Sequence, residues 1–584
     1  MLRALPLILS LCISSTAAGA APVSRDDPET SDPGGSAIST AIGSAVVVTA
    51  NPHASQAALA VLNAGGSAVD ALVTAQAVLA VVEPQSSGLA GGGFLLHWDA
   101  RRQQLEALDG RETAPQRSRP EDLLQPTGEP LPWRQATSRL EAVGVPGTVA
   151  LLWYAHQQHG RLPWATTLQP AIRLARDGFR PSPRLRRSLG IAQRIGVDHS
   201  PAFRALYLPG GQPPPADQLF RNPALANSLK LLARDGGPSF YNGALAELIL
   251  SGIATLQAEQ PGFRGWTAAD LSSYAVARRT PLCHRLLNHR LCTMPPPSSG
   301  GLAVLQTLAL LEQRNGLNQA SDPHTWRQLA HAQAWADADR LYWVHDPIDG
   351  AIPTGALLDP RYIQARNAAM QASPPRHPAP GLPPGVTRYP FALPDQGREQ
   401  GTTHLAIADA DGNIATYTSS VETVFGSRHL VEGMVLNNQL TDFSFQPAIN
   451  GRPVANRRRP GRRPVSSMAP VIVFRHGKPM LSVGSPGGRS IPHLLSRVLL
   501  ASLVWREPPA RAVGLPHLSL RRTGLAVEKD PPLPWPIVTD QLVLNDQPMR
   551  HQRLGSGTAL LQWINGRWHG AADPRREGTA LAIP

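Results

Sequence analysis

The feature that most constrains this chain is the junction between a proline-rich run and a predicted β-hairpin, at Gly401-Thr402. Residues 373–385 are rich in proline, a composition typical of an extended, solvated linker. Residues 403–408 and 414–420 have strand character, and the turn sequence 409–413 joins them. A cut before Thr402 would therefore leave a new N-terminus at the start of a strand.

Such a cut would give Thr402 a hydroxyl nucleophile and a base on the same residue, because its α-amine would be free. An α-amine titrates near pH 7.7–8.0 in model peptides, so about a tenth or more of it is neutral near pH 7. No histidine or aspartate partner is then required. Thr403 offers a hydroxyl one position later, and an ordinary hairpin is the alternative interpretation of this stretch.

Ordered motifs along the chain carry a resemblance that favours the first interpretation. They are Glu83-Pro84-Gln85-Ser86-Ser87-Gly88, Gly91-Gly92-Gly93-Phe94, Asp109-Gly110-Arg111-Glu112-Thr113-Ala114-Pro115, Met294-Pro295-Pro296-Pro297-Ser298-Ser299-Gly300-Gly301, Thr402-Thr403-His404, Asn437-Asn438-Gln439-Leu440-Thr441-Asp442, Pro464-Val465-Ser466-Ser467, Gly484-Ser485-Pro486-Gly487-Gly488 and Ala572-Asp573-Pro574-Arg575-Arg576-Glu577-Gly578. With them, nearly the whole chain after residue 40 resembles the γ-glutamyltransferase (γ-glutamyltranspeptidase, glutathione hydrolase) family of N-terminal-nucleophile hydrolases.

The resemblance implies an α/β fold, the four-layer α/β/β/α arrangement of N-terminal-nucleophile hydrolases. It also implies that large and small subunits come from one autocleaved precursor. The large subunit would span residues 41–401, ending in a linker at about 373–400, and the small catalytic subunit would span 402–584. The two would associate as a heterodimer.

The family's catalytic positions match four residues of this sequence. Thr402 matches the nucleophile, and Gly487 and Gly488 match the residues whose backbone N–H groups form the oxyanion hole. Two successive donors without Cβ can approach a developing oxyanion closely; the alternative is a tight turn after a strand. Ser420, on the paired strand, matches a hydroxyl near the nucleophile, and it could equally be an ordinary strand hydroxyl.

Other matches concern binding of a γ-glutamyl donor, which presents an α-carboxylate and an α-ammonium. Arg111 can bind the carboxylate through a bidentate fork, and Ser466 and Ser467 match hydroxyl contacts to the same group. Asp442 and Gln439 match contacts to the ammonium. The alternatives are an ion pair of Arg111 with Glu112 or Asp109, and a turn role for Asp442.

The sequence departs from the family pattern at two places. Glu422 stands where many members have asparagine; it could still accept from the ammonium and would add negative charge. The segment between Asp442 and Ser466 is short and resembles the lid-less branch that includes cephalosporin acylases. An open pocket would admit water and bulkier acyl donors.

The leading hypothesis is a γ-glutamyl hydrolase and transferase acting on glutathione-like donors, with water or an amino acid or peptide as acceptor. One alternative is an acylase for glutaryl or cephalosporin-type side chains, which lack the α-ammonium. Another is an uncleaved, non-catalytic relative that binds peptides or glutathione; the presence of Thr402, Gly487 and Gly488 argues against it.

Residues 1–20 have the pattern of a secretory signal peptide: Arg3, an apolar core at 5–13 and the small residues Ala18-Gly19-Ala20. Residues 21–40 are predicted to be a flexible N-terminus. Because the apolar run is too short to span a bilayer, we expect a periplasmic or secreted protein without a stable membrane anchor.

After removal of that segment, the cysteines left are Cys283 and Cys292, which flank a short strand-like stretch. In an oxidising compartment they could form a disulfide; the alternative is two buried thiols. Their spacing is not that of a zinc site, and we find no other His/Cys/carboxylate cluster with metal spacing in the sequence. We therefore expect no metal and no cofactor.

The net charge is +13, and the densest basic cluster lies at residues 457–463. Binding to nucleic acid or phospholipid is one interpretation of this charge. We favour arginines spread over the surface, because no nucleic-acid-binding motif accompanies the cluster, and we predict no nucleic-acid partner.

Overall fold

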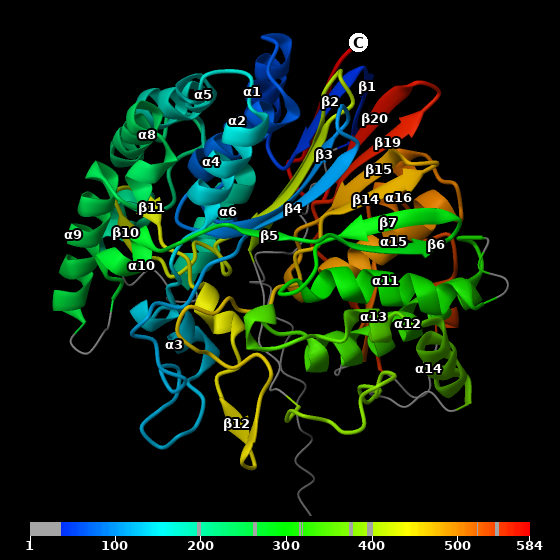
Figure 1. Cartoon of the computed structure of the whole chain (residues 1–584). Coiled ribbons are helices and arrows are strands. Elements are labelled where there is room, and N and C mark those ends of the chain that lie inside the picture. Colours follow the sequence, from blue (N-terminus) through cyan, green and yellow to red (C-terminus); the bar gives the residue numbers. More distant parts are fainter. Residues whose placement is uncertain are drawn as a thin grey trace, which may run out of the picture.

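The computed structural model contains two seven-stranded sheets that face each other between two layers of helices (Figure 1). It describes residues 37–194, 200–260, 265–314, 317, 319–372, 378–393, 401–521, 524–542 and 548–584. The predicted signal peptide, residues 1–20, lies outside this part of the chain, as does most of the predicted flexible N-terminus.

The first sheet has β8 and β9 at its centre. Its strands in spatial order are β21 (Thr579–Ile583), β2 (Ala45–Thr49), β8 (Thr402–Ala408), β9 (Ile414–Ser420), β3 (Gly92–Asp99), β4 (Gln104–Gly110) and β5 (Ala277–Arg279). The second sheet runs β1 (Ser39–Gly43), β20 (Arg567–Ala572), β19 (Ala559–Ile564), β15 (Lys478–Gly484), β14 (Val471–Arg475), β7 (His289–Thr293) and β6 (Leu282–Leu286). All pairings within these two sheets are antiparallel.

Each sheet is covered by helices on its outer face. Over the first sheet lie α1 (Pro52–Asn63), α2 (Ala68–Val82), α4 (Thr148–His159), α5 (Trp164–Asp177), α6 (Pro183–Arg194), α7 (Pro201–Tyr207), α8 (Pro223–Asp235) and α9 (Ala244–Glu259). Against the second pack α11 (Ser299–Glu312), α12 (Pro323–Trp343), α14 (Pro360–Ala372), α15 (Ile491–Leu503) and α16 (Pro509–Gly514). The predicted α/β/β/α fold is confirmed.

Smaller elements complete the described chain. They are α3 (Trp133–Thr137), α10 (Ala268–Ser272), α13 (Thr354–Leu357), the hairpins β10 (Leu430–Val431) with β11 (Met434–Val435) and β12 (Ala448–Ile449) with β13 (Arg452–Pro453), and the sheet β16 (Leu518–Arg521), β17 (Gly524–Glu528) and β18 (Met549–Gln552). Within the described residues, no helix is both long and apolar enough to cross a bilayer.

Alternating side chains explain why β2 is apolar on both faces. On β2, Val46 and Val48 point into the core between the sheets, whereas Ala45 and Val47 point into the core beneath the helices. Successive strand residues point to opposite faces, so a strand buried on both faces has no polar side. The two cores therefore share the strands that carry the site.

The hairpin of β8 and β9 is fixed by its turn. Oδ1 of Asp409 accepts hydrogen bonds from the amides of Asp411 (3.1 Å) and Asn413 (2.9 Å), and Gly412 adopts φ +84°. Oδ2 of Asp409 also accepts from the amide of Ala68 at 3.1 Å, at the start of α2. This local chemistry is why the hairpin could be predicted from sequence.

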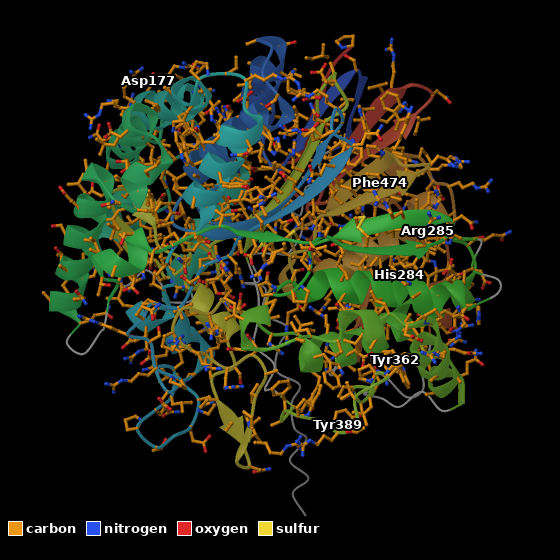
Figure 2. All side chains as sticks on the ribbon, in the orientation of Figure 1. Asp177, His284, Arg285, Tyr362, Tyr389 and Phe474 are labelled. Atoms are coloured by element: carbon orange, nitrogen blue, oxygen red, sulfur yellow. A yellow bond between two sulfur atoms is a disulfide. The ribbon has the colours of Figure 1, made fainter. Side chains whose placement is uncertain are left out.

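The structure shortens the predicted flexible N-terminus and shows how the two cysteines are arranged. Ser39 and Thr40 belong to β1 and pair with β20, so the predicted flexible segment ends before them. Residues 430–435 form the short hairpin of β10 and β11. Cys283 and Cys292 are cross-strand partners on β6 and β7 and form a disulfide, which decides between the two alternatives left open by the sequence. Figure 2 labels the adjacent residues of edge strand β6, His284 and Arg285.

Part of the predicted linker, residues 378–393, contains neither helix nor strand and lies against α12. The amide of Gly381 donates to Oδ1 of Asp339 at 2.8 Å, and the amide of Phe391 donates to the hydroxyl of Tyr342 at 3.0 Å. Residues 373–377 and 394–400 of the linker lie outside the described chain.

Candidate active site

The strand register places Thr402 beside Ser420, and Ser420 beside Gly92 on the next strand. Thr402 is 4% exposed, at the edge of the buried first sheet. The hydroxyl of Ser420 donates to the carbonyl oxygen of Gly401 at 2.7 Å and accepts from the amide of Glu422 at 2.8 Å. The carbonyl on one side of the Gly401–Thr402 bond is thus polarised by a buried hydroxyl.

Gly401 cannot be replaced without strain. Its φ is +89°, and a Cβ built on it would lie 2.6 Å from the carbonyl oxygen of Glu422. Both the left-handed backbone and this close approach require glycine. The residue before Thr402 is therefore held in one conformation by the chain that follows β9.

The loop of Gly487 and Gly488 approaches Thr402 from the second sheet. Gly484, at the end of β15, lies against the ring of His404 on β8; a Cβ on Gly484 would be 2.1 Å from that ring. Gly487 (φ +132°) and Gly488 (φ +53°) then turn the chain into α15. The two amides therefore lie in a glycine turn at a helix N-terminus, the positive end of the helix dipole.

Arg576 connects the loop that follows β20 to the strand of Thr402. Its Nη1 donates to the carbonyl oxygen of Thr402 at 2.6 Å. Gly557 lies against both Arg576 and Pro486, since a Cβ there would be 2.7 Å from the first and 2.8 Å from the second. Arg576, Thr402 and the loop before Gly487 thus meet at one point.

A second cluster surrounds Arg111, which is fully buried. Its Nη2 lies 2.5 Å from Oδ2 of Asp442 and donates to the carbonyl of Val465 at 2.9 Å. Nε2 of Gln439 donates to the same Asp442 oxygen at 2.6 Å. The structure therefore joins the residues predicted to bind carboxylate and ammonium in one buried cluster. The shortest contact of Arg111 is with Asp442, and not with Glu112 or Asp109, the alternative partners considered from the sequence.

Glu112 borders this cluster and has an unusual environment. It is fully buried, and within the described residues neither of its carboxylate oxygens has a hydrogen-bond partner. Burial raises the pKa of Glu112 to about 8, and Arg111, 3.6 Å away, offsets that only in part. Glu112 lies over Gly92, the strand neighbour of Ser420, so its carboxyl stands between the two clusters.

Ser466 and Ser467 follow the carbonyls that Arg111 contacts. The hydroxyl of Ser467 accepts from Nη1 of Arg340 at 2.7 Å, and that of Ser466 accepts from the amide of Met468 at 3.1 Å. Arg340 also donates to the carbonyl of Arg489 at 3.0 Å, so it connects this loop to the residue after Gly488.

Glu422 occupies the buried corner between the clusters. It adopts φ +82°, is 2% exposed, and its Oε2 accepts a very short hydrogen bond from the side chain of Asn438. Asn438 directly precedes Gln439. The structure thus brings all ten predicted site residues to adjoining positions, while Arg340, Arg576 and Glu112 were given no site role from the sequence although the last two lie in quoted motifs.

The basic cluster at 457–463 forms no open cationic surface. Arg459 and Arg462 pair with Asp349 at 2.9 and 2.6 Å, and Arg458 and Arg463 are buried. Between Asp442 and this basic cluster, the chain forms the hairpin of β12 and β13, which projects at the bottom of Figure 1.

Comparison with known proteins agrees with this geometry. The family profile described as Gamma-glutamyltranspeptidase matches residues 54–583. The chain belongs to the γ-glutamyltranspeptidase family. It is 32% identical to the glutathione hydrolase proenzyme of Bacillus subtilis (strain 168) over 557 residues, which cover 92% of this chain and 91% of the relative.

Acylases of the family are also similar. Acylase ACY 1 proenzyme of Pseudomonas sp. (strain SE83) is 29% identical over 92% of this chain and 93% of its own. The crystal structure of cephalosporin acylase from Bacillus halodurans superimposes with a TM-score of 0.81, covering 94% of this chain and 97% of that chain at 24% identity, which shows the shared fold. The family resemblance is confirmed.

Proposed function

We propose that this protein cuts itself before Thr402 and then hydrolyses or transfers the γ-glutamyl group of glutathione-like amides. The observation that carries the donor assignment is the buried contact of Arg111 with Asp442, reinforced by Gln439. The α-carbon of a γ-glutamyl donor carries a carboxylate and an ammonium, so its binding site needs a positive group and a negative group. A glutaryl group offers nothing to Asp442.

In the self-cleavage step, the Thr402 hydroxyl attacks the Gly401 carbonyl carbon. The C–N bond breaks, the nitrogen takes the hydroxyl proton, and an ester forms that water hydrolyses to a Gly401 carboxylate and a free Thr402 amine. Negative charge develops on the Gly401 oxygen, where Ser420 already donates at 2.7 Å. That contact supports a role for Ser420 beyond strand pairing.

In the mature enzyme, the neutral amine accepts the hydroxyl proton as Thr402 attacks the γ-carbonyl carbon of the donor. Gly487 and Gly488 would donate to the resulting oxyanion. The leaving amine departs with the proton, and an acyl-enzyme remains. Water completes hydrolysis, whereas an amino acid or peptide completes transfer.

The proposed subunits, residues 41–401 and 402–584, would stay associated after cleavage. β8 and β9 of the small fragment lie between β2 and β3 of the large one, joined by ladder hydrogen bonds. Separation would expose two unpaired edges in the middle of a buried sheet. We therefore propose a heterodimer, in an exported location consistent with the Cys283–Cys292 disulfide.

Chromogenic donors test the assignment directly. We expect γ-glutamyl-p-nitroanilide to give a kcat/KM at least tenfold above that of glutaryl-p-nitroanilide, with two fragments in the intact-mass spectrum. The reverse ratio would make the protein an acylase, which the short segment after Asp442 and the acylase relatives favour as second candidate. An uncut chain that releases no nitroaniline would indicate a binding protein.

Glu112 should make donor binding weaken at alkaline pH. Its pKa is about 8, so it is neutral below that pH and gains a negative charge 3.6 Å from Arg111 above it. The added charge opposes the donor carboxylate, so KM should rise about three- to tenfold between pH 7 and 9. Titration of the Thr402 amine should act on kcat instead. In Glu112→Gln, KM should rise less over this range, because only the α-ammonium of the donor then loses charge; a KM rise of equal size in that variant would contradict the assignment.

Arg340→Lys tests whether the contacts to Ser467 and Arg489 position the site. Lysine keeps the charge but lacks the planar fork that reaches Asp337, Ser467 and Arg489 together. We expect the donor KM to rise about tenfold with self-cleavage intact, measured by steady-state kinetics and intact mass. A fall in thermal stability with unchanged KM would instead assign Arg340 to the fold alone.

A further inference from the structure

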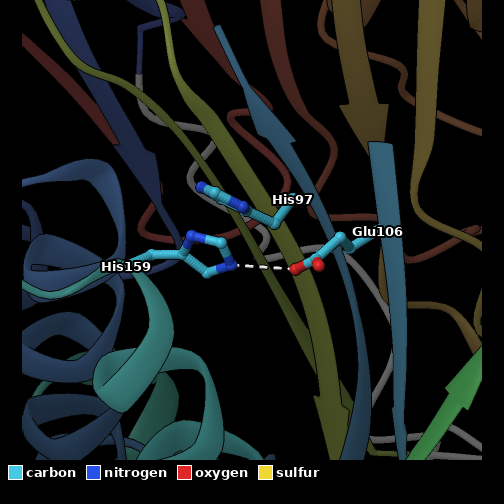
Figure 3. A group of neighbouring side chains, drawn as sticks. All are labelled: His97, Glu106 and His159. Carbon is cyan, nitrogen blue, oxygen red and sulfur yellow. Dashed lines mark hydrogen bonds and ion pairs between the residues drawn. The ribbon is translucent and has the colours of Figure 1, made fainter. Parts of the chain in front are cut away.

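Away from the candidate active site, His97, Glu106 and His159 form a compact cluster (Figure 3). One potential ligand atom from each residue lies within 4.8 Å of the other two. His97 and Glu106 are directly paired on β3 and β4, and His159 is the last residue of α4. Two sheet strands and a covering helix therefore direct two imidazoles and a carboxylate to one place.

The contacts within the cluster are only partly satisfied. Nε2 of His159 lies 2.8 Å from Oε2 of Glu106, as the dashed line in Figure 3 shows. The ring of His97 is tilted by 38° against that of His159, with centroids 4.0 Å apart. His97 is 3% exposed, and its Nδ1 has no hydrogen-bond partner within the described residues. A buried ring nitrogen without a partner is the observation that points to a missing ligand.

We propose that His97, Glu106 and His159 bind a divalent transition-metal ion of the zinc class. Two imidazole nitrogens and one carboxylate oxygen are a set that Zn²⁺ accepts, while Mg²⁺ and Ca²⁺ prefer all-oxygen sites. Three protein ligands leave one position for water. The side chain of Glu106 is 16% exposed, so solvent can reach that position.

Binding requires the three ligand atoms to converge while the two imidazole rings, whose centroids lie 4.0 Å apart, turn away from each other. Tetrahedral bonds of about 2.0–2.1 Å put ligand atoms about 3.4 Å apart, against a spread of up to 4.8 Å here. Glu106 would exchange its hydrogen bond to His159 for the ion. Its other oxygen lies 3.7 Å from Nη2 of Arg278, whose side chain is 64% exposed and therefore opposes a bound cation weakly.

Charge in the surroundings is compatible with one bound cation. Asp99 and Glu106 are the acidic groups near His97, and Arg102 and Arg278 are the basic ones near the cluster. The two arginines are 54% and 64% exposed on their side chains.

The proposed ion would not take part in the chemistry at Thr402. His97 stands five residues along β3 from Gly92, which pairs with Ser420 and, through it, with Thr402. Five steps of about 3.3 Å place the cluster about 16 Å from that end of the sheet. The ion would instead connect the end of α4 to the β3–β4 hairpin, so this inference is independent of the proposed function.

Isothermal titration of the untagged, chelator-treated full-length protein with ZnCl₂ tests the site. We expect one equivalent of Zn²⁺ per chain, and no binding of Mg²⁺ or Ca²⁺ under the same conditions. In His159→Ala and in Glu106→Gln, affinity for Zn²⁺ should fall at least 100-fold. His551→Ala, which removes an exposed histidine on β18, is the matched control and should bind as the wild type does.

Thermal unfolding gives a second measurement that depends on folded protein. Saturating Zn²⁺ should raise the midpoint temperature of the wild type and of His551→Ala, but not that of folded His159→Ala. Absence of stoichiometric binding in the wild type would overturn the proposal and leave a hydrogen-bonded His–Glu pair. Equal affinity in wild type and His159→Ala would overturn it too, because the ion would then bind elsewhere.

Discussion

Thr402→Ala should yield one uncut chain without donor turnover. The substitution removes the hydroxyl proposed both to break the Gly401–Thr402 bond and to form the acyl-enzyme, while the alanine side chain fits the same strand position. Removal of a nucleophile costs about 10⁴-fold or more in rate in well-studied hydrolases. Intact mass and a γ-glutamyl-p-nitroanilide assay on the same preparation measure both losses.

Two matched variants define what this result means. Thr402→Ser keeps a hydroxyl and should still cut at the same bond. Thr403→Ala removes the neighbouring hydroxyl, which is buried and has no hydrogen-bond partner within the described residues, so cleavage before residue 402 should persist. Cleavage that persists in Thr402→Ala would show that Thr402 is not the nucleophile of self-cleavage. Cleavage lost only in Thr403→Ala would assign that role to Thr403.

The sequence could predict those residues of the site that lie in or beside turns with a recognisable local sequence. The turn at 409–413 fixes the hairpin that carries Thr402, and the glycine turn at 487–488 follows directly from a strand. The ordered motifs added the donor residues through family resemblance. The four-layer arrangement was likewise implied by that resemblance and not by the pattern of the strands themselves.

The remainder depends on contacts between distant parts of the chain. Arg576 reaches the carbonyl of Thr402 across 174 positions, and Arg340 reaches Ser467 across 127. The sequence contains no local spacing that relates such pairs. The same reason explains why the sequence did not reveal the cluster of His97, Glu106 and His159: the first two meet through strand register, and His159 joins them from a helix.

The arginines at 457–463 illustrate the limit of composition arguments. Their density suggested either an acidic partner or scattered surface charge. The structure instead uses Arg459 and Arg462 to hold Asp349, and buries Arg463, which lies 3.4 Å from Asp109. The sequence shows how many arginines lie together, but the fold determines which carboxylates they pair with.

Asp442→Asn should separate γ-glutamyl from glutaryl donors. Asparagine has the same shape but cannot oppose an ammonium with a full charge, so kcat/KM for γ-glutamyl-p-nitroanilide should fall about 100-fold. Arg111 would lose its ionic partner at 2.5 Å yet keep the backbone carbonyls of Pro464 and Val465 as acceptors, so it should still bind a carboxylate. Glutaryl-p-nitroanilide turnover should therefore stay level or rise.

The ratio of the two donors is what decides the role of Asp442. Asp349→Asn is the control, because it also removes a carboxylate that pairs with arginines, but those arginines lie in the 457–463 cluster. We expect Asp349→Asn to keep kcat/KM for both donors within about twofold of the wild type. Intact mass should show complete self-cleavage in both variants. If Asp442→Asn lowered both donors equally, Asp442 would act by holding Arg111 in place, and ammonium recognition would have to come from Glu422 or Gln439. If only the γ-glutamyl donor loses turnover, the buried carboxylate is what distinguishes an amino acid end from a plain diacid, and the short segment after it does not convert this site to an acylase.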